Sequence, residues 1–249
     1  MSLWSAKNLG SAENWRPQKN DARTTVYRAF SNSCGDVIVK HFMLPGSASQ
    51  LRFWLRSRKL RRFYQEVSVP VAPLIAVSSD RSKKLGECVY RVVKGVDLRG
   101  LKSDDLVQAE WGSLFSAIGQ RVNQLHRSGW VHGDLKFGNV VFDREAGDSM
   151  SGVSFIDLEG VSKPVFNPQP KKSRDIARFI LNALEAQCGV DVLAQFWLSA
   201  THGYTKTEIS AFRKYTLRWL RALSLRHKNK YGKSVDVSQC DFLYESRLG

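Results

Sequence analysis

Two short segments carry side chains that could together perform metal-assisted phosphoryl transfer. Residues 131–142 read Val-His-Gly-Asp-Leu-Lys-Phe-Gly-Asn-Val-Val-Phe, and residues 155–160 read Phe-Ile-Asp-Leu-Glu-Gly. In the first segment, Asp134 could accept the proton of a substrate hydroxyl, and Lys136 could neutralise charge on the moving phosphoryl group. This chemistry depends mainly on positioning and charge neutralisation, so the spacing of the residues carries information.

Two further side chains, Asn139 and Asp157, are candidate ligands of Mg²⁺. Asn139 leads into apolar residues 140–142, which are typical of a strand, and residues 143–152 form a turn before a second apolar run at 153–156. Asp157 follows this run directly. The pattern predicts an antiparallel hairpin that brings the two candidate metal ligands together.

A purely structural interpretation of these residues exists. Asp134 and Asn139 would then be loop caps, and Asp157 would be a turn residue after a strand. The pattern Asp-x-Lys-x-x-Asn, with apolar flanks and a downstream Ile-Asp, is specific enough to favour the catalytic interpretation. His132 is expected to be structural, because Asp134 already fills the role of the base.

The two segments resemble the catalytic and metal-binding loops of the protein-kinase-like superfamily. Within it, the His-Gly-Asp form resembles the bacterial lipopolysaccharide core kinases, which phosphorylate heptose or Kdo sugars of the inner core. More distant resemblances are to aminoglycoside phosphotransferases and RIO-type kinases. Residues 125–131 look like the end of the helix before this family's catalytic loop, and residues 174–179 look like one of its later helices. The resemblance implies that Asp175 braces the catalytic loop.

The resemblance implies an α+β, two-lobed protein-kinase-like fold. A small β-rich N-lobe would cover residues 1–94 and a helical C-lobe residues 95–249, with ATP and Mg²⁺ bound by one kinase-like domain. Residues 24–30 and 36–40 read as two strands joined by a turn, and Lys40 ends the second strand. Lys40 is the candidate for holding the α- and β-phosphates.

Three departures from the general kinase pattern affect the ATP site. No Gly-x-Gly-x-x-Gly precedes Lys40, so another element must cover the phosphates. The expected helix at 49–63 is basic and contains no acid, and Glu66 is the only carboxylate near it, which puts the usual Lys-Glu pair in doubt. The metal-binding motif reads Asp-Leu-Glu, and its Glu159 is expected to face solvent rather than a second Mg²⁺.

Other parts of the chain predict the elements around the site. Residues 1–23, with Trp4 and Trp15, form either a mobile arm or a first strand. Residues 85–93 read as a strand that leads to a hinge near Lys94 and Gly95. An amphipathic helix before the catalytic loop should bury Val107, Trp111, Leu114, Ile118, Val122 and Leu125. Further helices are expected at 175–186, 190–199 and 207–226.

The acceptor is expected to be an anionic, membrane-associated sugar. The segment 160–174 is short and lacks Ala-Pro-Glu, which disfavours a peptide substrate. The chain has 38 Lys and Arg against 23 Asp and Glu, a formal net charge of +15, and this favours an anionic partner. The densest basic cluster lies at residues 52–62, and a second comprises Arg213, Lys214, Arg218, Arg221, Arg226, Lys228 and Lys230.

Aromatic and apolar residues lie within the first basic cluster. Phe53, Trp54, Leu60 and Phe63 could face either the core or a membrane interface, while the arginines reach phosphate head groups. A solvated helical face is the alternative. The same mixture would suit RNA, but the sequence contains no recognisable RNA-binding motif, so a nucleic-acid partner is not expected.

A cytoplasmic location is expected. Cys34, Cys88, Cys188 and Cys240 are scattered without a metal-ligand or disulfide pattern, which favours a reducing compartment. The first residues lack an apolar core, and no run of about eighteen apolar residues occurs. These features favour an enzyme held by charge at the inner face of a bacterial cytoplasmic membrane.

The sequence therefore predicts an ATP- and Mg²⁺-dependent sugar kinase whose acceptor is the lipopolysaccharide core, an anionic glycolipid. One alternative is an aminoglycoside-type small-molecule kinase or a protein kinase. Another is a pseudokinase-like binding module, because the glycine-rich loop is missing and the partner of Lys40 is in doubt.

Overall fold

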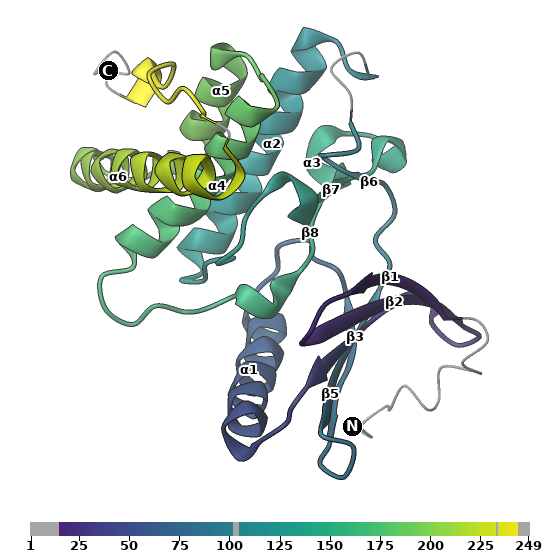
Figure 1. The fold of residues 1–249 in the computed structure, drawn as a ribbon. Coiled ribbons are helices and arrows are strands. Elements are labelled where there is room, and N and C mark those ends of the chain that lie inside the picture. The colour runs from purple at the N-terminus through teal and green to yellow at the C-terminus, as the bar shows by residue number, and fades with distance from the viewer. Residues whose placement is uncertain (1–14, 102–104, 233, 244–249) are drawn as a thin grey trace. The chain divides into compact units, whose positions relative to one another are not determined.

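The chain divides into two compact units in the computed structural model, which describes residues 15–101, 105–232 and 234–243 (Figure 1). The first unit comprises two segments, the chain up to Glu66 and Val71–Val93. The second unit comprises Val67–Pro70 and the chain from Lys94 onward. Val67–Pro70 joins the second unit although the sequence-based boundary leaves it in the first, and the carbonyl of Pro70 accepts the N–H of Phe155 there.

The first unit is built on a five-stranded antiparallel sheet with the strand order β1-β2-β3-β5-β4. Its strands are β1 (Arg16–Asn20), β2 (Thr24–Ser31), β3 (Gly35–Met43), β4 (Leu74–Asp80) and β5 (Leu85–Arg91). Val37 and Val39 alternate with half-buried residues along β3 and are fully buried, as expected for a strand with one core-facing side. The predicted strand pair at residues 24–40 and the strand before the hinge are confirmed.

The segment before β2 forms a strand where it is described. Trp4 lies outside the described residues. Trp15 packs against Tyr27 and His41, with ring centroids 5.3 and 5.5 Å away. Residues 16–20 then form β1, so the first-strand alternative is the correct one for this part of the chain.

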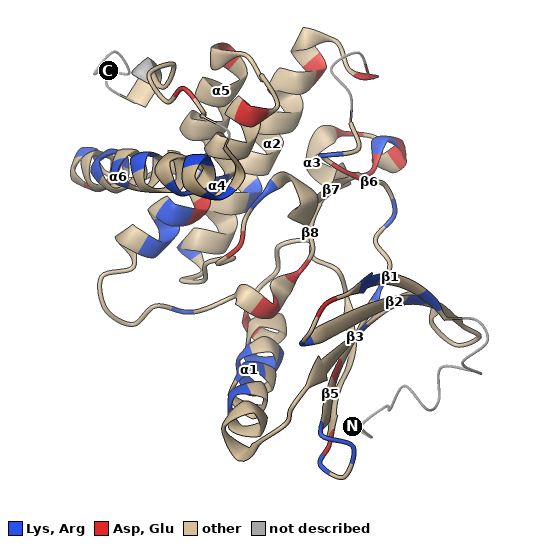
Figure 2. Ribbon diagram, viewed as in Figure 1, with Lys and Arg blue, Asp and Glu red and all other residues tan. Residues whose placement is uncertain are grey.

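The basic helix of the first unit is α1 (Ser47–Glu66), and its apolar residues do not share one face. Phe53, Leu60 and Phe63 are buried, because their spacing of seven and three residues places them on one side of the helix. Trp54 lies one position further round and remains 51% exposed. Lys and Arg residues recur through the middle of α1, where the ribbon is blue in Figure 2.

The second unit contains the predicted hairpin. Strands β7 (Val140–Phe142) and β8 (Val153–Phe155) pair antiparallel, with Val140 opposite Phe155, and the short strand β6 (Val96–Asp97) adds to the other edge of β7. The connecting turn holds a 3₁₀ turn, η5 (Arg144–Ala146), and the short helix α3 (Ser149–Gly152). The hairpin prediction is confirmed.

Four longer helices complete the second unit: α2 (Gln108–Arg127), α4 (Gln169–Glu185), α5 (Val190–Thr201) and α6 (Lys206–Tyr231). They confirm the four predicted helices, although α4 begins earlier and α6 ends later than expected. Helix α2 packs closely on α5, because a Cβ atom on Gly119 would lie 2.5 Å from the carbonyl oxygen of Phe196. None of the helices in the described ranges is long and apolar enough to cross a bilayer.

One predicted core residue of α2 lies outside the helix. Val107 precedes α2 in an extended conformation and is 66% exposed. Its N–H donates to the carboxylate of Glu110 at 2.9 Å, which caps the start of the helix. Leu114, Ile118 and Val122 are fully buried, as predicted.

A cluster of buried phenylalanines joins these helices. Phe115 of α2, Phe179 of α4 and Phe196 of α5 are fully buried, and the rings of Phe179 and Phe196 stack at 4.4 Å. Phe137, which lies in the predicted catalytic loop, packs against Phe115 and Phe179 at 6.0 and 5.2 Å. The loop is therefore anchored in the helical core.

Candidate active site

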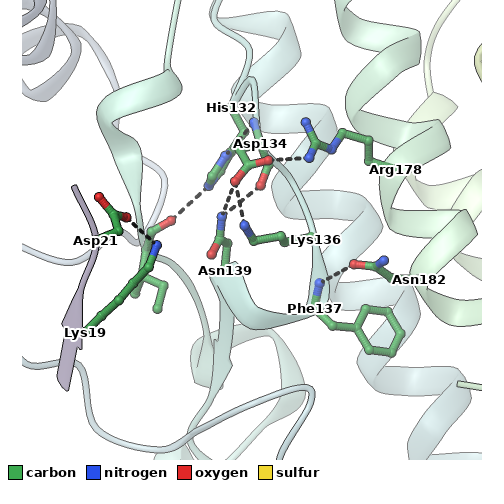
Figure 3. A network of polar contacts seen from close by, with 10 residues as sticks. Lys19, Asp21, His132, Asp134, Lys136, Phe137, Asn139, Arg178 and Asn182 are labelled. Carbon is green, nitrogen blue, oxygen red and sulfur yellow. Dashed lines mark hydrogen bonds and ion pairs between the residues drawn. The ribbon is translucent and has the colours of Figure 1, made fainter. Parts of the chain in front are cut away.

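Asp134 lies at the centre of a polar network in the loop between α2 and β7 (Figure 3). Its Oδ2 atom accepts from Lys136 Nζ at 2.7 Å and from Asn139 Nδ2 at 3.3 Å. Its Oδ1 atom lies 2.5 Å from Arg178 Nη2. A carboxylate oxygen has two lone pairs, so Oδ1 retains a position for a substrate hydroxyl.

The nitrogen and the oxygen of the Asn139 side-chain amide have different roles. Its Nδ2 atom donates to the backbone oxygen of Asp134 at 2.8 Å, which closes the loop. The amide oxygen, Oδ1, is then the atom that could bind a cation. Asn139 is 3% exposed and ends the 3₁₀ turn η4 (Phe137–Asn139).

Asp157 follows β8 and belongs to the same hairpin as Asn139. The N–H of Ile156 donates to the carbonyl of Asn139 at 3.0 Å. Asn139 directly precedes β7 and Asp157 follows β8, so the two candidate metal ligands lie at the same end of the hairpin. Asp157 adopts a left-handed conformation, with φ of 61°, before the 3₁₀ turn η6 (Leu158–Gly160). A carboxylate and an amide oxygen are hard ligands of the kind that Mg²⁺ prefers, so these residues fit the predicted metal.

Glu159 does not simply face solvent, as its sequence position led us to expect. The residue is only partly exposed, and its Oε1 atom is shielded from water. Glu159 lies in the 3₁₀ turn η6.

The catalytic loop packs directly on the Asp157 segment at two glycines. Gly133 has φ of +81°, and a Cβ atom there would lie 2.4 Å from the carbonyl oxygen of Gly160. A side chain at position 133 would force the two segments apart and would strain the backbone. Only glycine fits this position.

His132 links the loop to β8 as a neutral side chain. The N–H of Asp134 donates to His132 Nδ1 at 3.3 Å, so the proton lies on Nε2, which donates to the carbonyl of Ile156 at 3.0 Å. Burial lowers the pKa of His132, and its ring is fully buried. These contacts support the predicted structural role of His132.

Helix α4 holds the loop through a row of polar side chains on one face. Asp175 is 1% exposed, and its carboxylate accepts the N–H groups of His132 and Gly133 at 2.7 and 2.9 Å. Asn182 Oδ1 accepts the N–H of Phe137 at 3.1 Å. The predicted bracing by Asp175 is confirmed.

Sequence reasoning missed Arg178 and Asn182 as parts of the site. Positions 175, 178 and 182 are spaced three and four residues apart, so they lie on one face of a helix. This helical spacing from Asp175 is the signal in the sequence that indicates that Arg178 and Asn182 also face the loop.

His126, at the end of α2, also contacts Asp175. Its Nε2 atom lies 3.4 Å from Asp175 Oδ2, and both side chains are buried. Burial lowers the pKa of His126, and the carboxylate of Asp175 opposes this effect.

Lys40, the predicted phosphate ligand, lies on β3 of the first unit, whereas the other four predicted residues lie in the second. It alternates with buried Val37 and Val39, so it shares the sheet face of Phe42, whose ring packs against Phe53 of α1 at 5.6 Å. Lys40 Nζ is 5.5 Å from the ring centroid of Tyr90. Glu66, the only acid of α1, pairs with Arg62 at 2.5 Å.

Comparison with solved structures finds proteins of similar fold. WaaP in complex with acyl carrier protein is 18% identical, with a TM-score of 0.52, and the match covers 92% of this chain and 89% of that one. An aminoglycoside-3'-phosphotransferase of type VIII is 15% identical, with a TM-score of 0.55 and coverage of 83% and 94%. At these identities the similarity shows the fold alone, and it confirms the predicted two-lobed protein-kinase-like fold. A comparison with curated protein sequences found no match.

The fold is that of the protein-kinase-like proteins. The model of the lipopolysaccharide kinase (Kdo/WaaP) family matches residues 60–215, and the chain belongs to this family. It is therefore a kinase that acts on a sugar hydroxyl, and the predicted family resemblance is confirmed.

Replacing Asp175 should destabilise the second unit. In Asp175→Ala, the N–H groups of His132 and Gly133 lose their acceptor, which costs about 1–3 kcal/mol for each buried group. Asp175→Asn retains one acceptor oxygen and should lose less. Urea denaturation of both variants measures the difference. An Ala variant as stable as the Asn variant would contradict the bracing role.

The buried histidines should make the fold sensitive to acid. Below the ordinary histidine pKa of about 6.5, the unfolded chain binds protons that the folded chain does not, so the free energy of unfolding falls as pH falls. Each histidine contributes at most about 1.4 kcal/mol per pH unit. In urea denaturation between about pH 7.5 and 5.5, His132→Gln should flatten this dependence. Equal slopes for wild type and His132→Gln would refute the assignment.

Proposed function

We propose that this chain transfers the γ-phosphoryl group of ATP to a hydroxyl of a heptose or Kdo sugar in the inner core of lipopolysaccharide. Family membership supports a lipopolysaccharide core kinase. The observation that carries the proposal is the loop geometry: Asp134 keeps a lone pair on Oδ1 while Lys136 and Arg178 hold its carboxylate. This arrangement suits a group that orients and deprotonates a hydroxyl.

In the proposed reaction, the acceptor hydroxyl donates a hydrogen bond to Asp134 Oδ1. The hydroxyl oxygen forms a bond to the γ-phosphorus as the bond from that phosphorus to the β,γ-bridging oxygen breaks. The hydroxyl proton passes to Asp134, and ADP leaves. Lys136 Nζ, 2.7 Å from Asp134 Oδ2, is placed to neutralise charge beside the transferred group.

Asn139 and Asp157 would hold Mg²⁺ through the amide oxygen and the carboxylate. The ion supplies positive charge that neutralises the phosphate oxygens. Lys40 would bind the α- and β-phosphates, as the corresponding lysine does in related kinases. Its place on a central strand of the sheet, between β2 and β5, supports a fixed role of this kind.

We also propose that α1 docks the enzyme on the cytoplasmic face of the membrane. Leu51, Trp54 and Leu55 are each more than half exposed, and exposed arginines adjoin them on the same helix. Arg58 lies 4.8 Å from the ring centroid of Trp54, which places positive charge beside an interfacial aromatic side chain. Apolar and basic side chains of this kind bind anionic lipid surfaces together.

Replacing Asp134 or Asp157 should abolish most phosphate transfer. Asp134→Ala should lower the rate about 10²–10⁴-fold, because the base is lost, and Asp157→Ala should do at least as much, because the metal loses its carboxylate. The assay is transfer of labelled phosphate from ATP to purified core lipopolysaccharide, with circular dichroism to check folding. Asp191→Ala, an exposed acid on α5, is the control.

An unchanged rate in either active-site variant would remove that residue from the proposed site. If the folded wild-type protein transfers phosphate to no core sugar, the proposed acceptor is wrong. Absence of Mg²⁺-dependent ATP binding in the same preparation would favour the binding-module alternative.

Membrane docking should depend on the apolar side chains of α1. Trp54→Ser and Leu55→Ser should each weaken binding to anionic phospholipid vesicles roughly fivefold, as expected for loss of about 1 kcal/mol of apolar burial. Sedimentation with vesicles at low and high salt measures this effect, and binding should weaken as salt rises. Leu198→Ser, on α5, is the matched control. Equal binding by all three variants would exclude docking through α1.

A further inference from the structure

A basic groove lies between α4 and α6, and two of its lining residues contact the proposed catalytic base. It has a volume of about 290 Å³. Leu181 of α4 and Leu223 of α6 form its apolar part, and both are buried. The groove lies entirely within the second unit.

One face of α6 supplies the basic side of the groove. Leu223, Arg226, His227, Lys230 and Tyr231 line it at spacings of three, four, seven and eight residues, which place them on one helical face. Lys228 belongs to the same basic cluster but does not line the groove. The helix therefore places Arg226 and Lys230 of this cluster in the groove, and Lys228 outside it. Lys and Arg residues recur along α6, which Figure 2 shows in blue.

The groove is continuous with the active site. Lys136 and Arg178 line it, and the same two side chains bind the two carboxylate oxygens of Asp134. A sugar whose hydroxyl contacts Asp134 would therefore place its neighbouring substituents against this groove.

None of the described residues that line the groove is an acid, and the nearby carboxylates are paired. Asp134 is paired with Lys136 and Arg178, and Glu185 accepts from His227 Nδ1 at 2.5 Å. No carboxylate in the described parts of the chain forms an ion pair with Arg226 or Lys230. Lys230 Nζ lies 4.8 Å from the ring centroid of Tyr231. Two cations on adjacent turns thus face the groove with capacity for an anion.

We propose that this groove binds an anionic substituent of the acceptor, a carboxylate or a phosphate, next to the hydroxyl that is phosphorylated. Arg226 and Lys230 contact this group, and the acceptor sugar lies between it and Asp134. The inference rests on the proposed function and deepens it. It assigns acceptor recognition to the last turns of α6 and defines the acceptor as a sugar with a negative charge close to the reacting hydroxyl.

Acceptor kinetics test the assignment. Arg226→Gln and Lys230→Gln should each raise the KM for core oligosaccharide about tenfold or more, the effect of losing one charge-assisted hydrogen bond. Both should leave kcat and the KM for ATP within about threefold. Lys228→Gln removes the same charge from the other side of α6 and should match the wild type. Unchanged acceptor KM in both groove variants would overturn the proposal while leaving the kinase function intact.

Modified acceptors identify the anion. Carboxyl-reduced and dephosphorylated core oligosaccharides should differ in wild-type KM, and the treatment that raises it removes the group bound in the groove. Arg226→Gln should respond less to that treatment than the wild type does, because the contact is already lost. Equal responses of the variant and the wild type would contradict direct contact.

A binding experiment separates failure of this inference from failure of the proposed function. Free Kdo and inorganic phosphate can be titrated into the wild type and into Arg226→Gln, Lys230→Gln and the control Lys228→Gln, with binding followed by NMR without any phosphate transfer. Binding of either anion that weakens in both groove variants but not in Lys228→Gln supports the groove even if no core sugar is phosphorylated. Binding equal in all four proteins, or absent from the wild type, overturns it.

Discussion

The active-site loop depends on one buried carboxylate. Asp175 accepts the N–H groups of His132 and Gly133, which directly precede Asp134 in the chain. Burying a carboxylate is costly unless hydrogen bonds replace its hydration, and two backbone donors with His126 at 3.4 Å supply them. Because these bonds fix the backbone immediately before Asp134, they set where its carboxylate points.

Other contacts hold the same loop from different sides. His132 bonds to the carbonyl of Ile156, which links the loop to the segment between β8 and Asp157. Phe137 enters the aromatic core, and its N–H bonds to Asn182. Gly133 allows the loop to approach Gly160 more closely than any side chain would permit. Since α4 also supplies Arg178 to Asp134, the same helix braces the loop and contacts the proposed base.

The elements that depend on local pattern could be predicted from the sequence. The Asn139–Asp157 hairpin followed from two apolar runs and a turn, and the helices followed from apolar spacing. Contacts set by packing could not be read in this way. Trp54 and Phe53 are neighbours of similar character, yet only Phe53 is buried, because its side of α1 faces Phe42 and Gly86 of the sheet. The shielding of Glu159 Oε1 likewise depends on packing and has no local signal in the sequence.

The positions of the basic residues of α6 also could not be predicted from the sequence. Their composition indicates an anionic partner, but only the packing of α6 on α4 separates Arg226 and Lys230, which line the groove, from Lys228, which does not. Asp175 fixes the loop, and the groove lies beside Asp134. An acceptor with a negative charge near its reacting hydroxyl could contact Asp134 with the hydroxyl and the groove with the charge.

The central claim is that this braced loop is a metal-dependent phosphoryl-transfer site. A crystal structure with Mg²⁺ and a non-hydrolysable ATP analogue tests it most directly. We expect Mg²⁺ bound by the amide oxygen of Asn139 and the carboxylate of Asp157 at about 2.0–2.1 Å, with Asp134 Oδ1 facing the γ-phosphate. Mg²⁺ and nucleotide bound without contact to either Asn139 or Asp157 would contradict the account.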